Sequence, residues 1–142
     1  MVIPAPRERL ADCIWLPRIV ARARLQRIGK LPPEYAARFG APGSVDEVFL
    51  SHFGITKDEI IVASGGTDDE VAAWFSRLLG ATPERIHAWN HIAVNLGKPG
   101  FPLEARFPIG LATTYAHVAH LKPESVFAML EADEGQGQMG HR

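Results

Sequence analysis

Two arginines one helical turn apart are the residues best placed to bind an anion. Arg18 and Arg22 follow Pro17, and proline favours the first turn of a helix, so the sequence predicts both side chains on one side of a helix beginning there. A cation in the first turn opposes the helix dipole, and a second cation four residues later adds repulsion. We therefore predict a compensating anion, because a guanidinium forms paired hydrogen bonds with a carboxylate or phosphate. It is either a bound ligand or an internal acid such as Asp12, Asp133 or Glu134.

His52 is the residue best suited to acid or base chemistry. It lies at helical spacing among apolar residues, which are Val45, Val48, Phe49 and Phe53. That pattern predicts a partly buried ring. Two interpretations remain: a core histidine bonded to a backbone carbonyl, or a catalytic general acid or base whose pKa is tuned by burial.

Trp15, Trp89 and Asn90 are predicted to lie near each other in a ligand pocket. All three tryptophans, Trp74 included, fit apolar helical stripes, so core packing is the alternative to walling a pocket. A polar side chain such as Asn90 within an apolar stripe needs a hydrogen-bonding reason to be there. The pocket interpretation supplies that reason.

The histidines present a weaker metal pattern. Glu84, His87 and His91 are spaced so that they stack on one side of a helix. The opposite side carries the apolar stripe, which consists of Ile86, Trp89, Ala93 and Leu96. We therefore expect the histidines at the surface and assign no metal ligands. A second pair, His117 and His120, cannot be placed from the sequence.

Two further motifs are interpreted as structural. Cys13 is expected in a short helix beside Trp15, and a free cysteine is usually buried, although a nearby arginine would activate it as a nucleophile. Gly65-Gly66-Thr67 precedes a helix and has the form of a phosphate loop. Asp68, Asp69 and Glu70 occupy the first turn of that helix, where they would repel phosphate.

Helix starts are well marked in the middle of the chain. Three capping boxes are expected, and they pair Ser44 with Glu47, Thr56 with Glu59, and Thr67 with Glu70. Thr82 before Pro83 marks a fourth start. The predicted helices are 7–16, 17–28, 45–53, 57–64, 68–79, 83–96, 112–121 and 124–132, with a loop at 31–43. Residues 107–121 also suit a strand.

The fold class expected is all-α (mainly α), a compact bundle of about six to seven short helices. The chain of 142 residues predicts a single helical domain over 1–142, and its glycine-rich end predicts a mobile tail over 134–142. The Pro/Gly-rich segment near 97–111 is either a loop or a short added strand. With 46% hydrophobic and 22% charged residues, the composition excludes intrinsic disorder.

Charge is unevenly placed along the chain. Seven basic residues fall within residues 1–30, and seven acidic residues fall within 44–70. These segments are expected to face each other within one fold or across a homodimer, or to remain solvated. Nucleic acid is not an expected partner, because no aromatic residue is interleaved with the arginines. Neither a membrane span nor a cofactor is expected, and the single cysteine favours a cytoplasmic protein.

A set of motifs resembles a known family. The motifs are Leu16-Pro17-Arg18, Ala21-Arg22-Ala23, Gly54-Ile55, Glu70-Val71 with Trp74, Trp89-Asn90, and Ser125-Val126-Phe127 followed by Asp133-Glu134-Gly135. In order and spacing they resemble the bacterial family called domain of unknown function 5069 (DUF5069), over most of the chain. The resemblance implies the extent of the fold and no activity. This sequence departs from the family pattern in its Pro/Gly-rich segment 98–122 and in its several histidines.

Three functions remain open from the sequence. The first is a small-molecule-binding protein, for an anionic ligand or with acid/base enzyme activity. Its pocket between helices would use Trp15, Arg18, Arg22, His52, Trp89 and Asn90. The second is a homodimeric interaction or scaffold protein, and the third is a metal-dependent enzyme built on the histidines. We favour the first, because buried polar residues within apolar stripes require partners.

Overall fold

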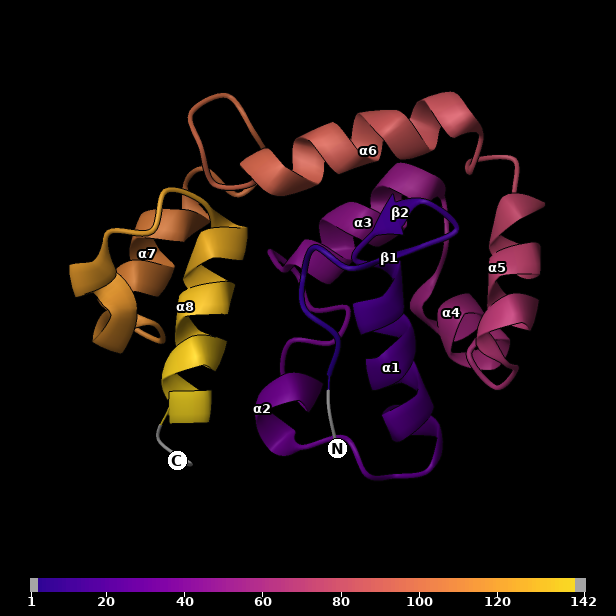
Figure 1. Cartoon of the computed structure of the whole chain (residues 1–142), viewed down its shortest axis with the longest axis horizontal. Helices are drawn as coiled ribbons and strands as arrows, with labels where there is room; N and C mark the ends of the chain where they lie inside the picture. Colours follow the sequence, from indigo (N-terminus) through magenta and orange to yellow (C-terminus); the bar gives the residue numbers. More distant parts are fainter. Residues whose placement is uncertain (1–2, 140–142) are drawn as a thin grey trace. The chain divides into compact units, whose positions relative to one another are not determined.

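The computed structural model describes residues 3–139, with side chains for residues 3–135. The chain is mainly helical, as predicted (Figure 1). Two short strands come first, β1 (Arg9–Leu10) and β2 (Cys13–Ile14). The helices are α1 (Leu16–Arg27), α2 (Pro33–Ala36), α3 (Val45–Phe53), α4 (Lys57–Ala63), α5 (Asp68–Ser76), α6 (Pro83–Asn95), α7 (Arg106–Ala112), the 3₁₀ helix η1 (Ala116–Leu121) and α8 (Val126–Met139).

The chain divides into two compact units, Met1–Asn90 and His91–Arg142, and the division falls within α6. The single helical domain expected over 1–142 stays a prediction. Among the described residues, no helix is both long and apolar enough to span a membrane.

An aromatic cluster forms the core of the first unit. Phe49 and Phe53 lie one turn apart on α3, and their ring centroids are 5.0 Å apart. Phe53 meets Phe75 of α5 edge to face at 5.0 Å, and Phe49 meets Trp89 of α6 at 5.4 Å. These tilted geometries suit aromatic rings, whose faces and edges carry opposite partial charges. The cluster joins α3, α5 and α6.

Side-chain caps set the starts of the central helices. Thr56 with Glu59 and Thr67 with Glu70 form the complete capping boxes that were predicted. Ser44 caps α3 by accepting from Glu47 N, but the Glu47 carboxylate accepts from Gly43 N instead. The reason is that Ser44 N already donates to Ala41 O in a turn. The third capping box is therefore only half formed.

The first predicted helix is wrong. Residues 9–14 form an antiparallel hairpin in which Arg9 pairs with Ile14 and Leu10 with Cys13. Its turn places Ala11 and Asp12 at φ 51° and 61°, the left-handed geometry that matches the twist of a two-residue hairpin. The sequence lacks the glycine or asparagine usual in this turn, so the hairpin depends on contacts made elsewhere in the unit.

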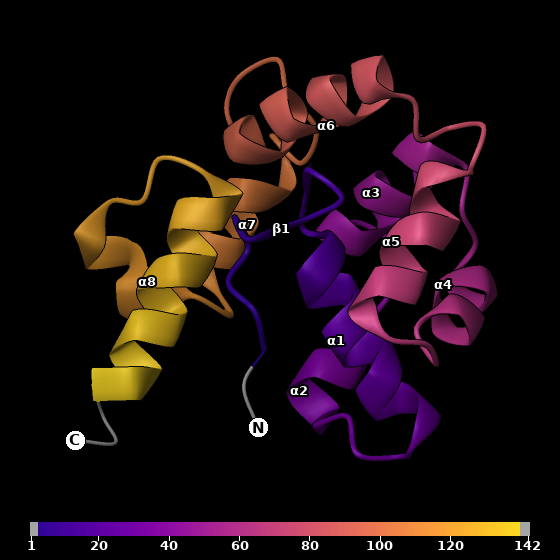
Figure 2. The same cartoon turned by 45° about the vertical axis from the view of Figure 1, so that its right-hand side comes forward.

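The second unit contains α7, η1 and α8, which lie together in both views (Figures 1 and 2). The strand considered at 97–111 is not formed: this segment consists of turns and the first part of α7. The single helix predicted at 112–121 is replaced by the end of α7 and η1, separated by a turn at Thr113–Tyr115. Buried Val118 and Phe127 belong to η1 and α8.

Helix α8 continues to Met139, past the end predicted at Ala132. The predicted mobile tail, 134–142, therefore begins inside this helix. Residues 140–142 lie outside the described residues, and the mobility of the tail stays a prediction.

The capping box of α5 generates a testable pKa. Hydrogen bonds from the backbone and side chain of Thr67 favour the charged carboxylate and lower the pKa of Glu70 below 4.5. Its stabilising effect is therefore present above pH 4.5 and lost as the pH falls through the lower folded-state pKa. We expect Thr67→Ala to raise the pKa of Glu70 toward 4.5, as followed by NMR titration of its carboxyl carbon. Thr56→Ala, which removes the cap of α4, is the control and should leave the pKa of Glu70 unchanged.

Candidate functional site

The N-terminal end of α1 brings three of the predicted site residues together. The guanidinium carbons of Arg18 and Arg22 each lie 5.2 Å from the ring centroid of Trp15. Each arginine is only 4% exposed, and Trp15 is 3% exposed. A guanidinium against an indole gains cation–π attraction, which is strongest when both groups are shielded from water.

Asp46 is the partner of Arg22, and the sequence analysis did not name it. Arg22 Nη1 donates to Asp46 Oδ2 at 2.9 Å, and Arg22 Nη2 donates to Oδ1. Trp15 Nε1 also donates to Oδ1, at 2.8 Å, while Gly40 N donates to Oδ2 at 3.0 Å. Asp46 is 1% exposed. Both carboxylate oxygens are thus bonded within a buried network that holds Arg22 and Trp15 in place.

A signal for Asp46 was present in the sequence. It lies three and four residues before Phe49 and Leu50 and seven before Phe53, on the buried face of α3. A buried carboxylate is costly unless it is paired and hydrogen-bonded. An acid on an apolar stripe therefore predicts a cation from another element.

Arg18 is the third residue of α1, because the helix begins at Leu16 and Pro17 is its second residue. Its Nη1 donates to the carbonyl oxygen of Pro4 at 3.1 Å. The preceding Trp15 adopts φ 79°, a left-handed conformation that is costly for a bulky residue. The Asp46 network supplies contacts that stabilise this conformation.

Trp89 and Asn90 hold the hairpin. Trp89 Nε1 donates to Ile14 O at 2.8 Å, and Ile14 N donates to Asn90 Oδ1 at 3.0 Å. Asn90 Nδ2 donates to Asp12 O at 2.8 Å. The side-chain amide of Asn90 therefore bonds the edge of β2 as a neighbouring strand would. These long-range bonds explain why residues 9–14 form a hairpin in place of the expected helix.

His52 is half-buried and links α3 to α6. Its Nε2 lies 2.8 Å from Arg85 O, and Arg85 in turn donates to His52 O. Because a carbonyl oxygen only accepts, Nε2 carries the proton. The ring lies 5.9 Å from that of Trp89, which connects His52 to the rest of the candidate site. This geometry is that of a structural histidine, and its catalytic role stays a prediction.

The basic and acidic segments meet within the first unit. Besides Arg22 with Asp46, Arg24 Nη1 lies 2.8 Å from Asp68 Oδ1. Arg24 also donates to the carbonyl oxygens of Ser64 and Gly66, at 3.0 and 2.9 Å. Cations at these carbonyls complement the C-terminal end of α4. The loop before α5 therefore binds a guanidinium through its carbonyl oxygens.

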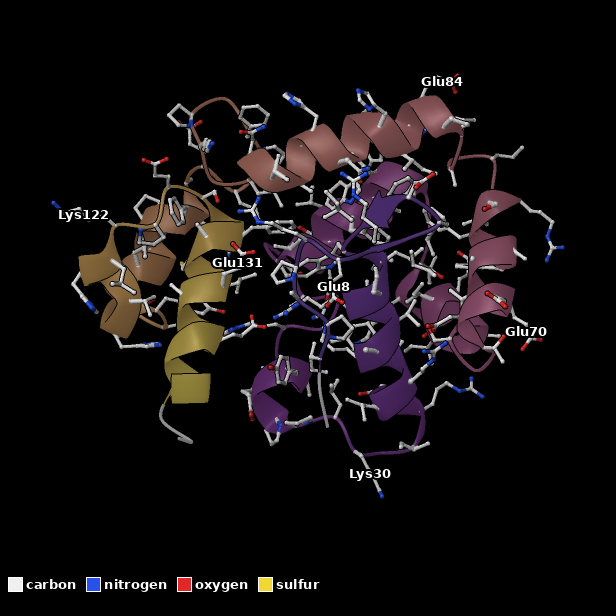
Figure 3. The ribbon with its side chains drawn as sticks, viewed as in Figure 1. Glu8, Lys30, Glu70, Glu84, Lys122 and Glu131 are labelled. Atoms are coloured by element: carbon white, nitrogen blue, oxygen red, sulfur yellow. The ribbon has the colours of Figure 1, made fainter. Side chains whose placement is uncertain are left out.

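Glu84, His87 and His91 are exposed, as the helical phase predicted, and Glu84 points away from the α6 ribbon (Figure 3). His117 Nε2 lies 2.5 Å from Asp133 Oδ1 in the second unit. Among the described residues, no three histidine, cysteine or acidic side chains are grouped so as to hold a metal ion.

Substitution of Asp46 tests the buried network. Asp46→Asn should lower the free energy of unfolding by about 3–5 kcal/mol, because it leaves the Arg22 charge buried without its counter-ion. The matched control is Asp68→Asn, whose partner Arg24 and whose own side chain are 36% and 69% exposed. It should cost at most about 1 kcal/mol. Chemical denaturation measures both values, and equal losses would contradict the network.

The thiol of Cys13 should be inert in the folded protein. Cys13 lies in β2, not in a helix, and it is fully buried. Burial raises the pKa of the thiol above its ordinary value, although the charge of Arg9 opposes the rise. Labelling by Ellman's reagent at pH 8 should therefore be no faster than unfolding, and rapid in guanidinium chloride. Fast labelling of the folded protein would show an accessible thiol.

Comparison with known proteins identifies the family. A family model described as "Domain of unknown function (DUF5069)" matches residues 2–136, nearly the whole chain. No curated protein and no solved structure gave a significant match. The motifs that resemble the family include residues of both structural networks, namely Trp89-Asn90 at the hairpin and Arg18 and Arg22 on α1. The chain belongs to the DUF5069 family.

Proposed function

We propose that the first unit binds a small anionic molecule, a carboxylate or a phosphate ester, through Arg18 at the start of α1. The observation that carries this proposal is the pair of buried guanidinium groups on one indole, Arg18 and Arg22 against Trp15. Two like charges on one helix, four residues apart, repel each other unless anions offset them.

Arg22 has a structural role in this proposal. Both of its terminal nitrogens donate to Asp46, so its hydrogen bonds support the protein itself. Trp15 is oriented by the same carboxylate. Arg22 and Asp46 hold the indole of Trp15 in place, so Arg18 lies against a rigid aromatic surface. A guanidinium that is already ordered loses less entropy when it binds a ligand.

The first turn of α1 favours an anion. Its residues include no acid, and Trp15 forms no side-chain cap with the described residues. Helices α3, α4 and α5 each begin with two or three acidic residues in the first turn. An acid in the first turn complements the positive end of the helix dipole. The first turn of α1 contains no acid of its own, so an anion from elsewhere would supply this complement.

The other functions from the sequence are less well supported. The homodimer was inferred from opposed charged segments, and the pairs Arg22–Asp46 and Arg24–Asp68 form within one chain. The metal enzyme was inferred from His87 and His91, which share an exposed face of α6. Trp89, Asn90 and His52 support the site indirectly, by holding the hairpin and α3.

Replacement of Arg18 tests the proposal. Inorganic phosphate at ten times its Kd should stabilise the wild-type protein by about 1.4 kcal/mol, and this stabilisation should be absent in Arg18→Ala. Arg18→Ala should also cost about 1–3 kcal/mol in the free protein, because the Pro4 carbonyl loses this donor and the Trp15 ring loses one of its two guanidinium neighbours. Thermal unfolding at increasing phosphate concentration measures both effects.

Arg27→Ala is the matched control for this experiment. It removes the same charge from the same helix, at an exposed site where Arg27 donates to Ile61 O. The phosphate effect should be retained in this variant. Equal stabilisation of wild type and both variants by phosphate would sink the proposal, because it would show a general salt effect.

A further inference from the structure

Helix α7 is apolar along its exposed side. The helix packs against its neighbours at Gly110, where an added Cβ would lie in van der Waals contact with the side chains of Tyr115 and Met129. No residue of α7 is buried. The residues directed away from Gly110 are exposed and apolar, and they are Pro108, Ile109 and Ala112. An apolar helix is normally covered on such a side, so this one lacks a covering element among the described residues.

The 3₁₀ helix η1, which packs against α7, adds apolar and basic groups to the same part of the second unit. Leu121, at the end of η1, is 49% exposed, and Ile109 of α7 is 59% exposed. Arg106 begins α7 and Lys122 follows η1; both are exposed, and Lys122 points away from the ribbon (Figure 3). Residues 105–123 contain no acidic side chain. We call the exposed residues of α7 and η1, with Lys122, the basic-apolar surface.

The outward face of α4 has the opposite charge. Ile60 is the buried residue of this helix, and Asp58 and Val62 lie one turn apart on the opposite side. Val62 is 72% exposed. Residues 58–76 include five acidic residues, all exposed, and no lysine, arginine or histidine. Asp58, Val62 and the neighbouring Glu59 are here called the acidic face of α4.

The cations of the first unit that lie close to α4 have partners away from this face. The ammonium of Lys57 lies 5.0 Å from the ring centroid of Phe39. Arg24 pairs with Asp68, and Arg27 donates to the carbonyl of Ile61 at 3.2 Å. Within the part of the chain whose side chains are described, Asp58 forms no ion pair. The acidic face of α4 therefore keeps its negative charge exposed to a partner.

We propose that the basic-apolar surface of one copy of this chain binds the acidic face of α4 of a second copy. Each surface presents exposed aliphatic side chains beside charges of one sign, and the two signs are opposite. Burial of the aliphatic groups supplies attraction, and the charges determine which surfaces meet. Because the two surfaces differ, the contact is heterologous, so each copy can bind one neighbour through each surface. The contact uses no residue of the proposed anion site.

Two complementary charge reversals test this contact. Asp58→Lys makes the acidic face of α4 basic, and Lys122→Glu places an acid on the basic-apolar surface. Each variant alone brings like charges together, so it should self-associate at least about tenfold more weakly than the wild type. An equimolar mixture of the two should recover association, because each variant retains the surface that the other has lost. Sedimentation velocity of the full chain at concentrations up to about 1 mM measures each case.

Glu84→Lys and Lys30→Glu are the matched controls. Glu84 lies in the first turn of α6, as Asp58 lies in the first turn of α4, and Lys30 is exposed like Lys122. Both control side chains point away from the ribbon (Figure 3). These variants make the same changes of charge outside the two surfaces, so they should associate like the wild type. Recovery in the mixture also shows that the two test variants are folded.

The results separate this contact from other occupants of the surface. Raising the NaCl concentration to about 0.5 M should weaken wild-type association, because salt screens exposed charges. Wild-type protein that stays monomeric up to about 1 mM would overturn the proposal, and so would a mixture no more associated than its two components. A monomeric wild type that binds vesicles containing phosphatidylserine would instead assign the basic-apolar surface to an anionic membrane.

Discussion

The buried carboxylate of Asp46 is the group on which the first unit depends. It accepts hydrogen bonds from Arg22 of α1, from Trp15 at the start of that helix and from Gly40 in the loop before α3. Removing a carboxylate and a guanidinium from water is costly, and the cost is offset only when their hydrogen bonds are satisfied. Because displacing either group would leave a buried charge unpaired, the Arg22–Asp46 pair favours the arrangement of α1 and α3 in which the two groups meet.

The strained start of α1 follows from this pair. Trp15 has a left-handed backbone that an isolated peptide would avoid, yet its indole is bonded to Asp46. On the other side of the same short segment, Trp89 and Asn90 bond the backbone of Ile14. Asp46 thus fixes the position of Trp15, while Trp89 and Asn90 fix that of the preceding Ile14. Together these two sets of contacts hold the junction between the hairpin and α1.

Local sequence signals were enough to predict most of the helices. The prediction failed where the structure depends on contacts between residues far apart in the sequence. The caps at Thr56 and Thr67 act through residues three positions away, so the sequence displays them directly. The hairpin at 9–14 depends on Asn90, 76 residues beyond Ile14, and no local pattern contains that information. Asp46 was predictable in principle from its place on the apolar face of α3, but its partner was not. Residue type and spacing were enough to select the candidate site residues. Their individual roles became clear only from the contacts that they make in the structure.

Arg18 and Arg22 illustrate how neighbouring residues of one type acquire different roles. They are equally buried and equally distant from the Trp15 ring. Asp46 bonds both terminal nitrogens of Arg22, which makes that arginine part of the scaffold. Arg18 has among its contacts a hydrogen bond to the Pro4 carbonyl, in a segment without regular structure. Replacing a cation whose two terminal nitrogens are both held by a buried carboxylate leaves that carboxylate unpaired, so Arg22 is the arginine that the scaffold requires. Under the proposed function, the binding role falls to Arg18.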